Sequence, residues 1–165
     1  MPNMEHLSLT YNLLSGSLLP IPSTNERLKT LRLNGNRLTG RITESMSSLK
    51  ALSDLQLSFN FLSGTIPSSL GEMRLLETLA LSNSEEAEDI SFMTGTVPST
   101  LSRLTNLKTL DLGYNRLTGT IPVLNQINLK LVYLTGNCLT MGSLQEVPLS
   151  TFAPGKTIAI QPQCL

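Results

Sequence analysis

The chain has 165 residues, which is enough for a single domain with a sizeable hydrophobic core. Twelve Lys and Arg balance twelve Asp and Glu, so the formal net charge is zero, and this absence of a basic excess argues against nucleic-acid binding. The 40% of hydrophobic residues argues against disorder, and no run of about 18 apolar residues occurs that would span a bilayer. No signal peptide is visible at the N-terminus.

A short motif with alternating leucines recurs along the chain. In residues 31–36 two leucines, separated by one residue, are followed by an asparagine, and residues 55–60 and 110–115 repeat this pattern. The second leucine, or its equivalent, lies at positions 9, 33, 57, 81, 112 and 134. The period is therefore 24 residues, with one insertion of seven residues near 84–90. Self-similarity at a fixed period of this length indicates a solenoid built from stacked units.

The second half of each unit repeats as well, as Leu-x-Gly-x-Ile-Pro with small variations, at residues 38–42, 62–67, 93–98 and 117–122. The whole unit, L-x-x-L-x-L-x-x-N-x-L-x-G-x-I-P, resembles the leucine-rich repeat. Its second half resembles the plant-type subclass, which occurs in ectodomains of receptor-like kinases and receptor-like proteins and in polygalacturonase-inhibiting proteins. The resemblance covers residues 1–142. It implies an α/β fold, a right-handed horseshoe-shaped solenoid with a concave parallel β-sheet, short second strands, and 3₁₀ or short helices on the convex side.

Leucine alternates with polar residues in each L-x-L segment, which is the periodicity of a strand with one buried face. One unit cannot bury its own leucines, so neighbouring units must stack. The chain bends after the strand, and an Asn side chain can both donate to and accept from backbone groups that lose their strand partners there. The resemblance implies a structural asparagine ladder inside this bend, formed by Asn12, Asn36, Asn60, Asn115 and Asn137.

Later in each unit, the glycines at positions 16, 40, 64, 95 and 119 predict a tight contact or a positive φ. Residues 43–49, 68–73 and 99–104 carry apolar residues three apart. This spacing predicts a short helical or 3₁₀ turn on the convex side.

We interpret residues 1–142 as six repeats, of which the first is truncated, and residues 143–165 as a C-terminal cap in which residues 157–160 could add a last strand. Residues 1–7 align with residues 104–110, so the chain begins inside a repeat. This favours a fragment of a longer array over a naturally uncapped protein. The insertion at 84–90 holds four of the acidic residues and is expected to be a solvated bulge rather than an acidic binding loop.

The two cysteines, Cys138 and Cys164, both lie near the C-terminal end. A disulfide between them would close a loop of about 27 residues, worth roughly 3–4 kcal/mol in the chain-entropy model. It would also imply an oxidising compartment. Two buried free thiols are the alternative.

The residues between and after the leucines are predicted to point outward on the concave sheet. One column holds three aromatic residues, and aromatic and arginine side chains on an exposed face are common interface anchors. The predicted ligand-binding residues are Tyr11, Arg32, Asp54, Gln56, Phe59, Asp111, Tyr114 and Tyr133. Scattered surface aromatics without a role are the alternative.

We therefore expect a non-catalytic module, a fragment of a receptor-like protein, that binds a protein or peptide on its concave face. The alternatives are a soluble inhibitor or defence protein of the polygalacturonase-inhibitor type, and an ice-binding protein or structural scaffold. The single histidine, His6, and the lack of a Ser-His-Asp or Cys-His grouping argue against an enzyme, and the lack of His and Cys clusters argues against a metal site. No cofactor is expected, and the expected location is extracellular or at the cell surface, with membrane attachment through a longer parent protein.

Overall fold

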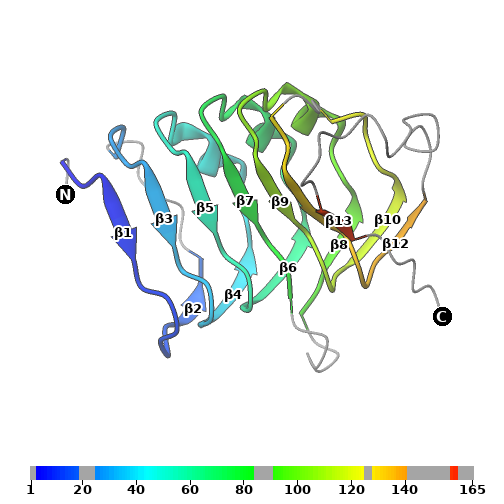
Figure 1. The fold of residues 1–165 in the computed structure, drawn as a ribbon. Coiled ribbons are helices and arrows are strands. Elements are labelled where there is room, and N and C mark those ends of the chain that lie inside the picture. The colour runs from blue at the N-terminus through cyan, green and yellow to red at the C-terminus, as the bar shows by residue number, and fades with distance from the viewer. Residues whose placement is uncertain (1–2, 19–24, 84–90, 125–127, 141–156, 160–165) are drawn as a thin grey trace.

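The computed structural model describes residues 3–18, 25–83, 91–124, 128–140 and 157–159. Figure 1 shows strands stacked side by side along one axis, with the N-terminus and the C-terminus at opposite ends of the stack. Each turn of the chain adds one strand to each of two sheets. This is the α/β solenoid that the repeat pattern predicts.

Within the described residues, seven parallel strands form the first sheet, in the order β1-β3-β5-β7-β9-β11-β13. The central residue of each strand from β3 to β11 is a buried Leu or Val, and these residues pair in register across the sheet. The last of the seven confirms the strand expected near residues 157–160. The strands are His6–Ser8 (β1), Thr30–Arg32 (β3), Asp54–Gln56 (β5), Thr78–Ala80 (β7), Thr109–Asp111 (β9), Leu131–Tyr133 (β11) and Thr157–Ala159 (β13).

The second sheet has six parallel strands in the part of the chain that the structure describes, in the order β12-β10-β8-β6-β4-β2. The pairing is staggered, because Gly40 pairs with Leu62 and Gly119 pairs with Leu139 rather than with the equivalent residue of the next repeat. The strands are Ser15–Ser17 (β2), Arg37–Arg41 (β4), Phe61–Thr65 (β6), Met93–Thr96 (β8), Arg116–Thr120 (β10) and Cys138–Thr140 (β12).

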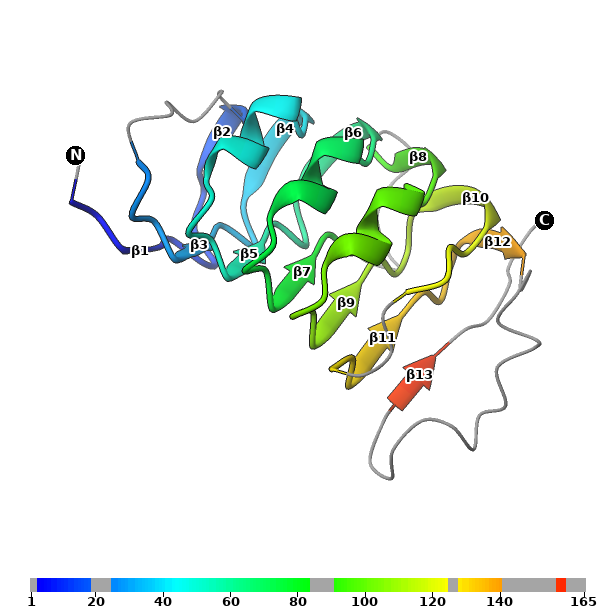
Figure 2. The ribbon, with the colours of Figure 1, turned by 90° about the horizontal axis from the view of Figure 1, so that it is seen from above.

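Three short 3₁₀ helices in the described ranges confirm the predicted turns. They are Glu44–Ser48 (η1), Ser68–Glu72 (η2) and Ser99–Arg103 (η3). Figure 2 shows the odd-numbered strands along the inner side of the bend and the helices away from them, so the first sheet is the concave face and the helices lie on the convex side. No helix in the described part of the chain is long and apolar enough to cross a membrane.

The core is one continuous stack of aliphatic side chains between the two sheets and the helices. Leu55, Leu79 and Leu110 are 0% exposed, and burying one such side chain stabilises the fold by about 1.5–3 kcal/mol. The first unit shows how much of this burial depends on a neighbour. Leu9 is 39% exposed, whereas the equivalent Leu57 is 1% exposed because another repeat precedes it. Stacking therefore supplies the burial, as the solenoid argument requires.

The glycines of the second strands satisfy two constraints at once. All five have the predicted positive φ, for example +79° at Gly95 and +76° at Gly119. An added Cβ at Gly119 would lie 3.0 Å from Cγ2 of Thr96, which follows Gly95 in the preceding repeat. From Gly40 onward, the side chain after one glycine thus lies over the glycine of the next repeat, so a Cβ there would require that side chain to shift. Gly16, in the first repeat, has nothing within 4 Å of this position.

The bend after each first-sheet strand is filled by an asparagine side chain that joins two repeats. Asn60 accepts from the amide of Leu38 at 3.0 Å and donates to the carbonyl of Leu33 at 2.9 Å, both in the preceding repeat. It also donates to the carbonyl of Leu57 in its own repeat at 3.0 Å. Each bridging asparagine is at most 6% exposed. The same arrangement occurs at Asn36, Asn115 and Asn137.

Two repeats of this series, the first and the fourth, differ from the others. Asn12, in the first repeat, is exposed and donates only to the carbonyls of Leu9 and Thr10 in its own repeat. In the fourth repeat the expected position falls on Ser84, and the insertion at 84–90 lies outside the described residues. The preceding Asn83 is buried and donates to the carbonyl of Ser91 at 2.7 Å.

Replacing Asn60 with Ala should lower the free energy of unfolding by about 2–4 kcal/mol, because it leaves a buried amide and two buried carbonyls without a side-chain partner. Asn12→Ala is the matched control and should cost less than about 1 kcal/mol, since Asn12 bridges no preceding repeat. Urea unfolding followed by circular dichroism measures both values. Equal losses for the two variants would contradict the bridging role.

Candidate ligand-binding site

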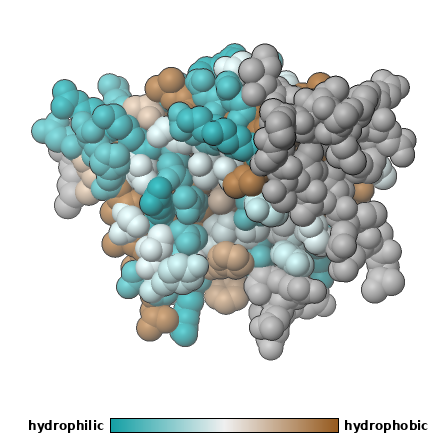
Figure 3. Space-filling model, in the orientation of Figure 1, coloured by the Kyte–Doolittle hydropathy of each residue, from teal (hydrophilic) through white to brown (hydrophobic). Residues whose placement is uncertain are grey.

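The concave face presents two columns of outward-facing residues, one on each side of the buried central residues of the first sheet. In Figure 3, which views the molecule from the direction of Figure 1, the described residues visible on this face are mainly hydrophilic with a few apolar spots. The first column is His6, Thr30, Asp54, Thr78, Thr109 and Leu131, and the second column is Ser8, Arg32, Gln56, Ala80, Asp111 and Tyr133.

Three of the predicted residues lie together on β3 and β5. Arg32 donates from Nε to Oδ2 of Asp54 at 2.8 Å, and a second guanidinium nitrogen lies 2.6 Å from the same oxygen. Gln56 donates from Nε2 to Oδ1 of Asp54 at 3.0 Å. The Asp54 side chain is 14% exposed while that of Arg32 is 47% exposed. The carboxylate therefore fixes the orientation of the arginine and the amide, and the guanidinium is the group that stays accessible to a ligand.

Asp111 on β9 is held in a separate network. Its Oδ2 accepts from the hydroxyl of Ser82 at 2.7 Å, and its Oδ1 accepts from the amide of Gly113 at 3.2 Å. Ser82 Oγ also lies 3.0 Å from Ser58 Oγ, so the network connects three repeats across the position of the insertion. Tyr133 pairs in register with Asp111 and is 38% exposed. These two residues place an acceptor beside a phenol at the C-terminal part of the concave face.

The three aromatic residues of the predicted column follow the strands rather than lie within them. Tyr11, Phe59 and Tyr114 each come three residues after a strand, with φ of +52°, +56° and +51°. Such values are rare for residues other than glycine and cost conformational energy. The equivalent positions of two other repeats are Gly35 and Gly136, with φ of +70° and +73°. The aromatic column is thus a set of left-handed turn positions along the edge of the concave face.

Two of the aromatic rings lie over the glycine of the following repeat. An added Cβ at Gly35 would lie 2.5 Å from Cδ1 of Tyr11, and one at Gly136 would lie 2.7 Å from Cδ1 of Tyr114. The exposed fraction is 76% for Tyr11 and 46% for Phe59, while Tyr114 is half-buried. The rings are therefore supported from below by a neighbouring repeat and remain accessible from above.

Ion pairs between repeats occupy the residues just before the strands. Lys29 lies 2.7 Å from the Glu5 carboxylate, and Lys108 lies 2.6 Å from the Glu77 carboxylate. The hydrogen bond and the charge of Lys29 lower the pKa of Glu5. All four side chains are largely exposed, and exposed pairs contribute little to stability. These residues lie along an edge of the concave face and leave the face open.

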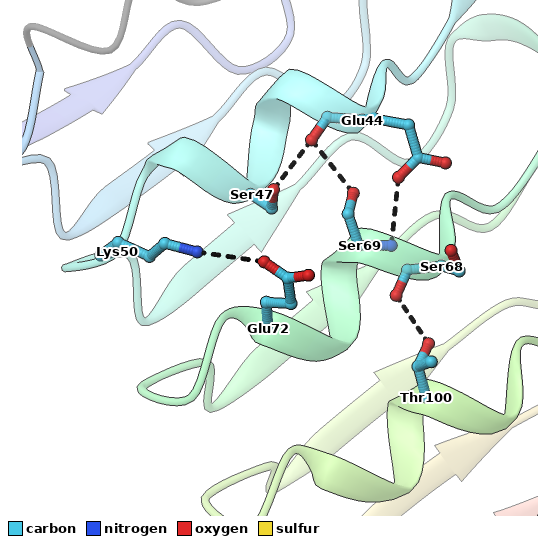
Figure 4. A network of polar contacts seen from close by, with 7 residues as sticks. All are labelled: Glu44, Ser47, Lys50, Ser68, Ser69, Glu72 and Thr100. Atoms are coloured by element: carbon cyan, nitrogen blue, oxygen red, sulfur yellow. Dashed lines mark hydrogen bonds and ion pairs between the residues drawn. The ribbon is translucent and has the colours of Figure 1, made fainter.

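On the convex side, polar groups form hydrogen bonds and ion pairs between successive repeats (Figure 4). Ser69 donates from its amide to the Glu44 carboxylate at 3.1 Å and from its hydroxyl to the Glu44 carbonyl at 3.0 Å. Thr100 donates to the carbonyl of Ser68 at 2.6 Å, so all three helices are connected. The convex contacts thus connect successive repeats, as the asparagines do in the bend.

Within the described ranges no group of three or more His, Cys, Asp or Glu side chains could hold a metal ion. His6 is exposed on β1, with Nδ1 at 3.0 Å from Oγ1 of Thr30. Cys138 at the start of β12 is disulfide-bonded. Cys164, the other cysteine of the sequence, lies outside the described residues, so its pairing with Cys138 stays a prediction.

Sequence reasoning missed Ser58 and Ser82, whose hydroxyls connect the two halves of the concave face. They share a column with Asn34, two residues after the strands, and Ser58 and Ser82 are both buried. The sequence did contain a signal for a polar column here, because small polar residues recur at this position in three successive repeats. The column alone does not give the hydrogen-bond partners.

The Leucine Rich Repeat family model matches residues 27–49, 51–73 and 106–125. Among solved structures, the BIR2 ectodomain from Arabidopsis thaliana is 30% identical with a TM-score of 0.70, over 89% of this chain and 72% of that chain. PEPR1 in the PEPR1-AtPEP1 structure is 34% identical with a TM-score of 0.76, over 85% and 19% of the two chains. The plant peptide hormone receptor RGFR1 in complex with RGF2 is 28% identical with a TM-score of 0.69, over 84% and 25%.

The chain therefore belongs to the plant-type leucine-rich repeat family. It covers 19% to 25% of the length of the receptors PEPR1, TDR and RGFR1, and 72% of the BIR2 ectodomain. No curated protein matches the chain.

The left-handed backbone conformation at Phe59 predicts which substitutions this position tolerates. Phe59→Asn should leave the free energy of unfolding within about 1 kcal/mol of the wild type, because Asn adopts this conformation more readily than other residues. Phe59→Val should lose at least about 1–2 kcal/mol, because a β-branched residue is strained there. Phe61→Val is the control, since the extended backbone of β6 suits valine. Thermal unfolding measures all three, and equal stability of the two Phe59 variants would contradict this reading.

Proposed function

We propose that the chain is a non-catalytic recognition module whose concave face binds a peptide or an extended segment of a protein. The observation that carries the proposal is the row of oriented polar and aromatic groups on that face. Arg32 is fixed by Asp54, and Asp111 is fixed by Ser82, so neither group needs to be ordered when a ligand binds. A preorganised surface of this kind supports binding without any reacting group.

The expected ligand-binding residues divide into two parts on this surface. Arg32, Asp54 and Gln56 form the N-terminal part, and Asp111 with Tyr133 forms the C-terminal part. The aromatic residues Tyr11, Phe59 and Tyr114 follow one edge of both parts. An extended peptide lying across the strands would contact both parts and the aromatic edge. The structures of PEPR1-AtPEP1 and of RGFR1 with RGF2 support this reading, because their receptors share this fold.

We further propose that the module works outside the cell or at its surface. BIR2 and SOBIR1, which share the fold, are ectodomains of plant proteins. The disulfide at Cys138 fits an oxidising compartment. We propose that attachment to a membrane comes from a longer parent protein.

Peptides selected from a random display library against the wild-type protein test the concave site. The triple variant Tyr11→Asn, Phe59→Asn, Tyr114→Asn should bind the selected peptides at least about tenfold more weakly, since aromatic anchors carry much of the energy of an interface. Asn is used because it keeps the left-handed turn. Lys50→Gln with Glu72→Gln, which removes an exposed ion pair on the convex side, is the control and should bind like the wild type. Unchanged binding by a folded triple variant would refute the site.

The disulfide makes a separate prediction. Alkylation of the purified protein without reductant, followed by mass spectrometry, should label neither Cys138 nor Cys164, and reduction should expose both. Breaking the bond by Cys138→Ser should lower the free energy of unfolding by about 3–4 kcal/mol in the chain-entropy model. Labelling of both thiols before reduction would remove the argument for an oxidising compartment.

A further inference from the structure

The outward face of the second sheet has a charge pattern that the concave face lacks. The strands β2, β4, β6, β8, β10 and β12, which make up this sheet in the described part of the chain, contain three arginines and no Asp or Glu. The arginines are Arg37, Arg41 and Arg116, and all three are exposed. Since the net charge of the chain is zero, this surface is a local positive excess.

Two of these arginines flank an exposed aromatic ring. Arg37 and Arg41 point outward from β4 on either side of Thr39, while Leu38 between them is buried. Thr39 pairs in register with Phe61 on β6, so Phe61 lies beside the middle of this arginine pair. Phe61 is 45% exposed. We call Arg37, Arg41 and Phe61 the lateral patch.

The same combination recurs two repeats further along the sheet. The guanidinium carbon of Arg116 lies 4.8 Å from the centroid of the Phe92 ring, which is a cation–π arrangement. Arg116 and Phe92 occupy the positions equivalent to Arg37 and Phe61 in their repeats. Arginine next to an aromatic ring is therefore repeated on this face.

The lateral patch differs in its contacts from four other cationic groups of the described residues. Lys29, Lys50 and Lys108 each lie within 3.3 Å of a carboxylate of a neighbouring repeat, and Arg32 lies within 2.6 Å of Asp54. Among the described residues, no carboxylate forms an ion pair with Arg37 or Arg41. The aliphatic part of Arg41 covers Gly64, where an added Cβ would lie 2.9 Å from Arg41 Cγ and Cδ. Nε of Arg41 lies 3.1 Å from the same position, so the side chain lies against the next repeat, and the residue as a whole is exposed.

We propose that the lateral patch binds an acidic segment of a partner protein that also carries apolar side chains. Carboxylates of the partner would be held by Arg37 and Arg41, because the guanidinium fork matches a carboxylate with two parallel hydrogen bonds. An apolar side chain of the partner would pack on Phe61 between them. The charge of the patch selects an acidic partner, and the exposed ring favours a polypeptide over a sugar polyanion, which has no side chain for that position. This second surface is independent of the concave site.

Binding of a fluorescent peptide of alternating Glu and Leu, measured by anisotropy at low salt, tests the proposal with the full chain. Arg37→Gln with Arg41→Gln should weaken binding about fivefold to tenfold, since each exposed charge-assisted contact contributes modestly. Gln at position 41 keeps the Cγ and Cδ that lie over Gly64. Phe61→Ser, which leaves the charge unchanged, should weaken binding about threefold or more. Added salt should weaken the wild-type interaction.

The matched control is Lys50→Gln with Arg103→Gln on the convex side, which removes the same charge from another surface. It should bind the peptide like the wild type, and circular dichroism should show that every variant is folded. Equal weakening by the control pair would mean that only net charge matters and would overturn the proposal. Two other results would also overturn it: a Glu-Ser peptide or dextran sulfate binding as tightly as the Glu-Leu peptide, and full binding by Phe61→Ser. The aromatic triple variant of the concave face should still bind this peptide. The experiment therefore distinguishes failure of the lateral-patch proposal from failure of the proposed concave site.

Discussion

A buried asparagine amide that joins two consecutive repeats is the interaction on which this structure depends. A tight bend leaves backbone amides and carbonyls without strand partners, and burying them unpaired would cost several kcal/mol per repeat. Asn60 pairs these groups. Its side-chain oxygen accepts from one backbone amide, and its side-chain amino group donates to backbone carbonyls of two repeats. Each bridging side chain bonds to backbone groups of the preceding repeat. The backbone groups in one bend are therefore paired only when the next repeat stacks on it.

The same dependence on a neighbouring repeat appears on the other sides of the solenoid. A side chain after the glycine of one second-sheet strand lies over the glycine of the next, as Thr96 does over Gly119. The helices continue the pattern, since Glu44 accepts twice from Ser69 of the next repeat. Bend, lateral sheet and convex side are thus all tied to their neighbours. The concave columns, the aromatic edge and the lateral patch remain accessible.

Periodicity predicted most of the fold because each rule of the repeat is a local rule. The L-x-L alternation predicted the first-sheet strands, and the apolar spacing in residues 68–73 predicted a 3₁₀ turn. The left-handed backbone of Tyr11 was not predicted, although Gly35 in the same column was a usable signal. The contact of Arg32 with Asp54 depends on the side-chain conformations of residues in two repeats. An alignment of the repeat sequences does not give these conformations. The predicted insertion, the rest of the cap and Cys164 lie outside the described residues, so those expectations stay as they were.

Native-state hydrogen exchange of single amides tests the bridging role of the asparagines most directly. The amides of Leu38, Met93 and Leu117 are donors to an asparagine side chain, and they should exchange as slowly as the amides within β5 and β9. In Asn60→Ala, the amide of Leu38 should lose protection while that of Leu117 keeps most of it. Fast exchange at Leu38 in the wild type, or loss of protection that is uniform along the variant chain, would contradict the account.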